Sequence, residues 1–297
     1  MSTERPTVIL KDLPADLAHR VVDALGDTDV AVQTAVNGQQ LPPPPPVQEG
    51  RVIVVISPKG GSGKTAVATN LAAMLSKQHP GQVVAVDLDV QFGDLCTSLS
   101  LHPERNLSQL AHAPVIDSTT VKVFLTPSET GLFVLCAASR PEDADVITER
   151  HVSTVLQLLA RDFAYVVVDT PAGLDERTLS AVENATELLL VSSLDVTSIR
   201  SLRKAVDTLQ QMGIATPRTF VLNRADAKVG LTVDDAAKAV GLPVACTIPS
   251  SRDVPLAMNL GQPVVQLEPK SGVAKQFGQL ARLFDSTIGV DGKRRRR

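Results

Sequence analysis

Uninterrupted apolar runs recur along the chain after residue 50, and segments with helical spacing separate them. The runs cover residues 52–56, 83–86, 132–137, 165–168, 187–191, 220–222 and 244–248. A half-exposed strand alternates apolar and polar residues, whereas a strand covered on both faces does not. These runs are therefore typical of the buried strands of a parallel sheet.

Apolar residues recur at helical spacing between the runs. The helical segments lie near residues 65–78, 148–161, 175–184, 196–212, 232–240 and 272–288. Strands that alternate with helices predict an α/β fold, in which a mostly parallel, doubly wound sheet is flanked by helices. Right-handed crossovers would place the functional loops at the carboxyl ends of the strands.

The chain before residue 50 has a different pattern. We predict a strand over residues 7–10, a helix near 14–25 and a second strand near 30–36, so that residues 1–36 form a short strand–helix–strand segment. About 40 residues are too few for a stable independent core, so this segment would dock on another surface or be mobile.

Consecutive prolines at residues 42–46 mark a linker, because proline runs favour polyproline II and exclude helix and sheet interiors. We predict the linker over residues 37–50, the α/β domain over 51–290 and a basic tail over 291–297. The prolines suit a plain spacer, and a ligand for an aromatic groove is the alternative.

Composition indicates an ordinary globular protein. Of the 297 residues, 43% are apolar and 21% are charged, and the formal net charge is −3. This balance excludes a polycation built to coat nucleic acid, because basic residues gather only at 293–297. The N-terminal residues lack the pattern of a signal peptide, and no apolar run approaches the ~20 residues that cross a bilayer.

The three cysteines, Cys96, Cys136 and Cys246, lie far apart in the sequence. Their odd number and spacing indicate neither a disulfide framework nor a CxxC metal pair. Cys136 and Cys246 fall within apolar runs and are expected to be small core residues. These features suit a reducing cytosol, so we expect a cytoplasmic protein.

A glycine-rich loop separates the run at 52–56 from the helix that follows it. The residues expected to bind nucleotide there are Lys59, Gly60, Gly61, Ser62, Gly63, Lys64, Thr65 and Ala66. Glycines allow backbone N–H groups to surround phosphate oxygens, and the helix N-terminus adds partial positive charge. Lys64 would reach the β- and γ-phosphates and the Thr65 hydroxyl would bind Mg²⁺, so the predicted cofactors are ATP and Mg²⁺.

One position departs from the general phosphate-loop pattern GxxxxGK[ST]. Pro58 stands where the first glycine of that pattern would be, and Lys59 begins the loop instead. A glycine-rich turn that binds nothing is the alternative interpretation. The strand before the loop, the helix after it and its two lysines favour a phosphate loop.

Aspartates follow two of the apolar runs. Asp87 and Asp89 alternate at a strand end, so one would approach the Mg²⁺ shell while the other faces the γ-phosphate. Asp169 ends another strand and would hold Mg²⁺ through water. Each could instead be a turn or capping residue, but the phosphate loop favours Thr65, Asp87 and Asp169 as the metal site.

The segment KGGSGKT, residues 59–65, resembles the deviant Walker A motif of the ParA/MinD superfamily of ATPases. The resemblance implies that Lys59 acts in trans on the nucleotide of a dimer partner, while Lys64 acts in cis. A second cation near the γ-phosphate would stabilise transition-state charge, as an arginine finger does. Hydrolysis would then depend on an ATP-dependent homodimer, with Lys59, Lys64 and Asp89 as catalytic residues.

Further motifs extend the resemblance. DLD, residues 87–89, looks like switch I of the family, in which Asp89 would position or activate the attacking water. DTPAG, residues 169–173, looks like switch II and contains Pro171 and Gly173. The phosphate loop and both switch segments of an ATPase would therefore lie in the domain over 51–290.

Two segments resemble the family's adenine site. Asn223 and Arg224, at the end of the run 220–222, would meet the adenine, and Pro249 would lie on the other side of the base. An asparagine amide offers a donor and an acceptor together, which suits an adenine edge. The family usually has an aspartate two residues after this proline, whereas this chain has Ser251.

The stretch DLDVQFGDL, residues 87–95, is more specific and looks like the CpaE/TadZ branch, whose members are linked to Tad-type pilus assembly and polar placement. The similarity runs over residues 51–288. That branch usually carries a full receiver-like domain, whereas only residues 1–36 precede the linker here. The resemblance implies protein partners in a pilus or another envelope machine, and leaves room for division-site or flagellar placement.

Two other functions fit the same motifs. A partition ATPase that rides on DNA would need a basic surface, for which the candidates are Arg200, Arg203 and Lys204 on one helix and the basic tail. A scaffold that binds nucleotide and hydrolyses it poorly would use the same loop. A metallocluster ATPase is disfavoured, because Cys136 falls in a strand and Cys96 stands alone.

The last helical segment raises the question of membrane binding. Its apolar residues at helical spacing are Val273, Phe277, Leu280, Phe284 and Ile288. With the basic tail, such a helix can bind anionic lipid, as the C-terminal helix of MinD relatives does, which would place the protein at the inner face of the membrane or at a cell pole. The alternative is a last helix packed on the sheet with a solvated tail.

Overall fold

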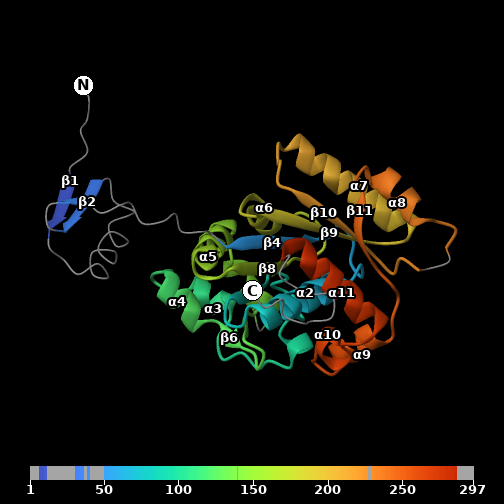
Figure 1. The fold of residues 1–297 in the computed structure, drawn as a ribbon, viewed down its shortest axis with the longest axis horizontal. Coiled ribbons are helices and arrows are strands. Elements are labelled where there is room, and N and C mark those ends of the chain that lie inside the picture. Colours follow the sequence, from blue (N-terminus) through green and yellow to red (C-terminus); the bar gives the residue numbers. More distant parts are fainter. Residues whose placement is uncertain are drawn as a thin grey trace. The chain divides into compact units, whose positions relative to one another are not determined.

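The structure is a computed structural model that describes residues 7–11, 31–36, 39–40, 50–138, 140–226 and 229–285. The chain divides into two compact units, Met1–Gln48 and Glu49–Arg297, and each has a sheet of its own (Figure 1).

The sheet of the first unit has two parallel strands and a short third one. Strand β1 (Thr7–Lys11) pairs in parallel with β2 (Ala31–Val36), and β3 (Gln39–Gln40) pairs antiparallel with β2. Both strands predicted here are confirmed. Strand β3 lies within the segment predicted as linker, and the proline run and the predicted helix near 14–25 lie outside the described residues.

The second unit is built on an eight-stranded sheet with the order β11-β10-β9-β4-β8-β5-β7-β6. Its strands are β4 (Arg51–Ile56), β5 (Val83–Asp87), β6 (Thr126–Pro127), β7 (Leu132–Leu135), β8 (Tyr165–Asp169), β9 (Glu187–Ser193), β10 (Arg218–Asn223) and β11 (Val244–Ile248). Neighbouring strands are parallel except β6, which runs antiparallel to β7. The predicted strands and the predicted doubly wound α/β fold are confirmed, although the run over 132–137 leaves the sheet at Leu135.

Helices cover both faces of this sheet (Figure 1). One face carries α2 (Lys64–Gln78), α9 (Asp253–Asn259), α10 (Val264–Leu267) and α11 (Gly272–Phe284). The other carries α3 (Leu107–Ala111), α4 (Ser118–Val123), α5 (Glu149–Asp162), α6 (Glu176–Glu183), α7 (Val196–Gln211) and α8 (Val233–Val240). The described residues also form two short 3₁₀ helices, η1 (Thr97–Leu99) and η2 (Pro141–Val146). The sequence patterns missed α3, α4, α9 and α10, which are too short to show a clear helical period.

Consecutive residues of β4 belong to two separate cores. Val54 packs into the core under α5 and α7, whereas Ile53 and Val55 pack into the core under α2 and α11, and all three are 0% exposed. Side chains of a strand point alternately to its two faces. Burial of both faces therefore explains why this run has no polar alternation.

Helix α11 buries its apolar stripe against the sheet. Val273, Phe277, Leu280 and Phe284 are at most 3% exposed, and they join the core that contains α2 and β11. For Gly272–Phe284 the structure therefore favours a packed helix over a lipid-facing one, while Ile288 and the basic tail lie outside the described residues. Within the described part of the chain, no helix is long and apolar enough to span a bilayer.

Truncation of one residue of this stripe tests its packing. We expect Phe277→Ala to lower the free energy of unfolding by about 3–5 kcal/mol, because the side chain is 1% exposed and its loss leaves a cavity. Leu283→Ala, on the same helix but 47% exposed, is the matched control and should cost less than ~0.5 kcal/mol. Urea unfolding measures both, and equal small losses would contradict a buried α11.

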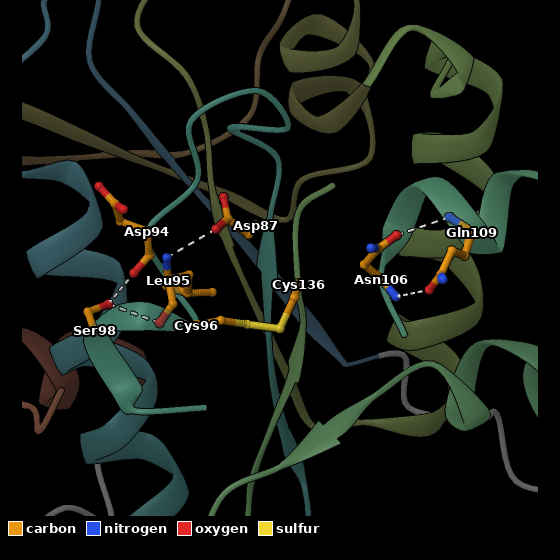
Figure 2. Close-up of a disulfide and its surroundings, with 8 residues drawn as sticks. All are labelled: Asp87, Asp94, Leu95, Cys96, Ser98, Asn106, Gln109 and Cys136. Atoms are coloured by element: carbon orange, nitrogen blue, oxygen red, sulfur yellow. Dashed lines mark hydrogen bonds between the residues drawn. A yellow bond between two sulfur atoms is a disulfide. The ribbon is translucent and has the colours of Figure 1, made fainter. Parts of the chain in front are cut away.

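Two of the three cysteines form a disulfide, which their number and spacing in the sequence did not indicate. Cys96, which follows the loop after β5, is bonded to Cys136 directly after β7, with Cα atoms 6.0 Å apart (Figure 2). Strands β5 and β7 are neighbours, so the fold joins cysteines that are 40 residues apart in sequence. Cys246 is free and buried, as predicted. With a disulfide present, the cysteines no longer argue for a reducing compartment.

Candidate functional site

The glycine-rich loop connects the carboxyl end of β4 to α2, whose first residue is Lys64. Gly61 and Gly63 have φ angles of +74° and +91°, which side-chain-bearing residues rarely adopt. A Cβ on Gly63 would also lie 2.4 Å from Asn223 Nδ2. At Gly60 and Gly61 a Cβ would meet no heavy atom within 4 Å, so the loop borders open space into which a phosphate group fits.

Lys64 lies buried among carboxylates at the N-terminus of α2. Its exposed fraction is 8%. Burial lowers the pKa of Lys64, and the nearby carboxylates of Asp169 and Asp89 oppose that shift. The structure thus brings the cis lysine of the sequence analysis together with two of the predicted acidic residues.

Asp169, the last residue of β8, is 1% exposed, and neither of its carboxylate oxygens has a hydrogen-bond partner of ordinary geometry among the described residues. Burial raises the pKa of Asp169 to about 7 with help from Asp89, and the Thr65 hydroxyl and the Lys64 ammonium limit the rise. The Ser62 hydroxyl is also buried, and no described residue is its hydrogen-bond partner. Unsatisfied buried polar atoms need an explanation, and a bound Mg²⁺·nucleotide supplies one.

Asp87 lies beside Asp169, because β5 and β8 are neighbours and these two residues pair in register. Its Oδ1 accepts the Asp89 N–H at 3.2 Å and its Oδ2 accepts the Leu95 N–H at 3.1 Å. Burial raises the pKa of Asp87, and the carboxylates of Asp169 and Asp89 add to the shift. Asp87 therefore organises the loop that carries Asp89, a role that the sequence patterns did not show.

The acidic residues alone do not form a complete metal site. Among the residues that the structure describes, no group of three or more His, Cys, Asp or Glu is placed to hold an ion. Mg²⁺ usually keeps several waters and takes one or two carboxylates together with nucleotide phosphate oxygens. Thr65 and Asp169, with Asp87 beside them, fit that donor set.

Lys59 is held by the N-terminus of α7 in its own chain. Its Nζ lies 3.3 Å from Asp195 Oδ1 and 2.6 Å from Thr197 Oγ1. Asp195 also caps α7, where it accepts the Ser198 N–H at 2.9 Å and the Ser198 hydroxyl at 2.6 Å. Burial opposes the shift, but the hydrogen bonds from Ser198, Thr197 and Lys59 together lower the pKa of Asp195. Sequence reasoning missed this contact, although the Asp195 capping position was visible.

The segment that contains Pro171 and Gly173 is fixed against the strand that precedes the phosphate loop. The Thr170 hydroxyl donates to Val55 O at 2.8 Å, and the Gly173 N–H donates to Ser57 O at 3.4 Å. Gly173 has a φ of +102°. This predicted switch segment therefore lies directly beside the loop.

A pocket of about 330 Å³ lies on the other side of the loop. Its lining residues are Gly63, Ala66, Asn223, Arg224, Pro249, Ser250, Ser251, Val254, Pro255, Met258 and Asn259. Asn223 Nδ2 donates to Ser62 O at 2.8 Å, which ties this pocket to the phosphate loop. The structure brings together Asn223, Arg224 and Pro249, and adds residues of α9 that no sequence pattern indicated.

Comparisons with known proteins show the family of the chain. A protein-family model described as an AAA domain matches residues 50–219. The septum site-determining protein MinD of Thermotoga maritima is 30% identical over 247 residues, which cover 78% of this chain and 87% of that protein. The chain belongs to the ParA/MinD superfamily of ATPases. The resemblance stated from the sequence motifs is confirmed at this level.

Solved structures of ParA/MinD-superfamily proteins share the fold. A ParA family ATPase from Chlorobium tepidum matches with a TM-score of 0.74 and 26% identity, over 79% of this chain and 98% of that one. MinD from Pyrococcus horikoshii, solved with Mg-ADP, matches with a TM-score of 0.72 and 25% identity, over 82% of this chain and 99% of that one. The match covers nearly the whole length of each of these two solved structures.

Proposed function

We propose that the protein is a Mg²⁺·ATP-binding and hydrolysing switch, which dimerises on ATP and positions or regulates a cell-envelope machine. The observation that carries the proposal is the convergence of Lys64, Thr65 and the buried Asp169, whose carboxylate oxygens have no partner of ordinary geometry in the described part of the chain. Relatedness to the MinD protein solved with Mg-ADP supports ATP and Mg²⁺ as cofactors.

The proposed roles follow from the chemistry of each group. The N–H groups of the glycine-rich loop and the α2 N-terminus would bind the phosphates, and Lys64 would pair with their terminal charge. The Thr65 hydroxyl and Asp169, with Asp87 beside it, would hold Mg²⁺, which neutralises charge on the phosphate oxygens when bound. Asp89 would orient the attacking water.

The adenine would occupy the pocket beside α9. Asn223, Arg224 and Pro249 all line this pocket, which supports the proposal. The apolar side chains of Val254 and Met258 offer a surface for a flat ring. The aspartate missing at Ser251 is not needed to form this pocket.

Lys59 supports the dimeric part of the proposal. Lys59 is paired with Asp195 and Thr197 of its own chain. The side chains of Lys59 and Asp195 are 45% and 42% exposed, and Thr197 is exposed too. To act on a partner's nucleotide, Lys59 would have to leave this exposed ion pair, and exposed pairs contribute only about 0–1 kcal/mol. The cost of releasing Lys59 is therefore small compared with its interaction with a γ-phosphate.

Concentration dependence tests the trans role of Lys59. We expect the ATPase rate per molecule to rise with protein concentration in the wild type, and the Lys59→Ala rate to be at least ~100-fold lower at every concentration, because a transition-state cation is lost. Lys275→Ala, which changes an exposed lysine on α11, is the matched control and should behave as the wild type. A wild-type rate per molecule that stays constant on dilution would exclude the trans mechanism. Measurable ATP binding without any hydrolysis would leave the scaffold alternative.

The envelope role rests on the CpaE/TadZ-like stretch over 87–95, which supports a Tad-type pilus or a related machine as the partner. We place the protein in the cytoplasm, with peripheral contact at the inner face of the membrane or at a cell pole. Because the apolar stripe of α11 is buried, such contact would come from a protein partner or the basic tail.

The DNA-riding alternative depends on the basic residues of α7. Arg203 pairs with Asp207 at 2.9 Å and donates to Val240 O at 3.2 Å, so its guanidinium serves contacts within the protein. Only Arg200 and Lys204 of that set then remain as exposed candidates on this helix. ATP-dependent, salt-sensitive DNA binding would favour the partition alternative over the envelope role.

A further inference from the structure

The Cys96–Cys136 disulfide lies at the end of the acidic loop that follows β5. Asp87 ends β5, the loop carries Asp89, and Leu95 precedes Cys96. The bond joins the loop's far end to the residue after β7, the strand next to β5 (Figure 2). The Cα separation of 6.0 Å lies within the range that disulfides span without backbone movement.

Noncovalent contacts hold the same loop end as well. Leu95 N–H donates to Asp87 Oδ2, and the Ser98 hydroxyl donates to Asp94 O at 2.8 Å and to Leu95 O at 2.9 Å (Figure 2). The Ser98 hydroxyl also lies 3.4 Å from the Thr69 hydroxyl of α2, and the Leu95 side chain is 0% exposed in the core. The disulfide adds a covalent link from this end of the loop to the residue after β7.

The position of Asp89 makes this link relevant to the site. Its carboxylate lies close enough to Lys64 and Asp169 to raise the pKa of both groups. Val90 and Leu95 are at most 2% exposed, whereas Phe92 between them is 73% exposed, so the middle of the loop has little apolar anchorage and depends on how its two ends are held. A restraint at Cys96 therefore limits where Asp89 can move.

The three cysteines differ in access. Cys136 is 2% exposed, Cys96 is half-buried, and Cys246 is 6% exposed. Burial raises the pKa of the Cys246 thiol to about 11, which keeps it protonated and poorly reactive. Cys96 is thus the most accessible of the three cysteines. Cys136 is the adjacent thiol that can displace a mixed disulfide formed on Cys96.

We infer that Cys96 and Cys136 form a reversible thiol–disulfide switch that fixes the loop carrying Asp89 when oxidised and releases it when reduced. The effect on the loop is independent of catalysis, and the effect on ATP turnover rests on the proposed function. Disulfides in cytosolic proteins are mostly transient and redox-sensing, which fits the location proposed above.

The chemistry is thiol–disulfide exchange with a low-molecular-weight disulfide such as oxidised glutathione. The Cys96 thiolate attacks one sulfur of that molecule, a mixed disulfide forms on Cys96, and one small thiolate leaves. The Cys136 thiolate then attacks Cys96 Sγ and expels the second small thiolate. Two protein thiols are oxidised, the small disulfide is reduced to two thiols, and these take up the two protons released.

Amide hydrogen exchange of the full chain tests the loop effect. We expect the amides of residues 90–95, with Leu95 as the direct reporter, to exchange at least about tenfold faster after reduction than in protein oxidised with glutathione disulfide. Cys136→Ser should show the fast exchange under both conditions. Cys246→Ser, the matched control, should respond to oxidation as the wild type does. Identical exchange in the two states, or three free thiols after oxidation, would overturn the inference.

Turnover provides the second measurement. The oxidised protein should hydrolyse ATP about three- to tenfold faster than the reduced protein, because a fixed loop holds Asp89 near the site and less conformational freedom is lost on binding. The difference should vanish in Cys96→Ser and persist in Cys246→Ser. Equal or slower turnover after oxidation contradicts the coupling. A loop response without any hydrolysis keeps the switch and removes the proposed ATPase, so the two failures are distinct.

Discussion

We expect the Lys64→Ala protein to bind Mg²⁺·ATP about 100-fold more weakly than the wild type, a loss of ~2.8 kcal/mol. Lys64 is 8% exposed at the N-terminus of α2, where its ammonium and the helix N–H groups would act on the same phosphates. A charge-assisted contact in a partly buried site is stronger than one at the surface. Titration with a fluorescent ATP analogue in Mg²⁺ measures the affinity.

The same substitution also affects folding. Lys64 offsets the charges of Asp89 and Asp169, so its loss should lower the free energy of unfolding of the nucleotide-free protein by about 1–3 kcal/mol. Lys77→Ala changes an exposed lysine at the other end of α2 and should alter neither affinity nor stability. Wild-type affinity in a folded Lys64→Ala protein would disprove the assignment of the phosphate site.

The second large effect is expected at Asp169, where function and stability should change in opposite directions. At pH 7.5, Asp169→Asn should raise the free energy of unfolding of the nucleotide-free protein by about 2 kcal/mol, because it removes the charge of a carboxylate that is 1% exposed and whose pKa burial has raised. It should also remove most of the Mg²⁺ dependence of ATP affinity, because the amide is a poor ligand for this ion.

The dependence on pH has a definite sign. The folded pKa of Asp169 is about 7 and an unfolded aspartate titrates near 3.9, so between these values the folded state holds a proton that the unfolded state has released. The contribution of Asp169 to stability is therefore fully present below about pH 4 and is lost as the pH rises to 7. Asp87 adds a slope of the same sign, since burial raises its pKa too.

Urea unfolding at several pH values between 5 and 8 checks this prediction. The stability difference between Asp169→Asn and wild type should already be present at pH 5 and should grow further until about pH 7. Asp94→Asn, an exposed carboxylate near the same loop, is the control and should follow the wild type. A difference that does not change with pH would contradict an elevated pKa at Asp169, and unchanged Mg²⁺ dependence would contradict its role as a ligand.

Local patterns in the chain were sufficient for the sheet and the phosphate loop. Seven of the eight strands contain an apolar run whose buried residues marked them, and the contiguous residues 59–65 contain the whole loop. The two-residue strand β6 is partly exposed and was missed. The short elements α3, α4, α9 and α10 escaped notice, because fewer than two turns give no clear period. Because α9 was not predicted, Met258 and Asn259 were not predicted to line the pocket beside the loop.

Contacts between distant segments required the folded chain. The order of strands places Asp87 beside Asp169, brings Lys59 to Asp195, and joins Cys96 to Cys136. None of these pairs has a spacing that repeats in the sequence, because the strand order interleaves segments from far apart in the chain. The burial that raises the pKa of Asp169 likewise comes from packing around the strand ends rather than from its neighbours in sequence.

The amino-acid sequence alone therefore established the α/β fold and the superfamily, and it predicted the residues that would face the nucleotide, because these depend on local period and a contiguous motif. The charge state of the buried carboxylates, the restraint on Lys59 and the covalent link at the end of the Asp89 loop came from the three-dimensional arrangement. They depend on solvent exclusion and on distances between separate strands, which a linear pattern does not encode.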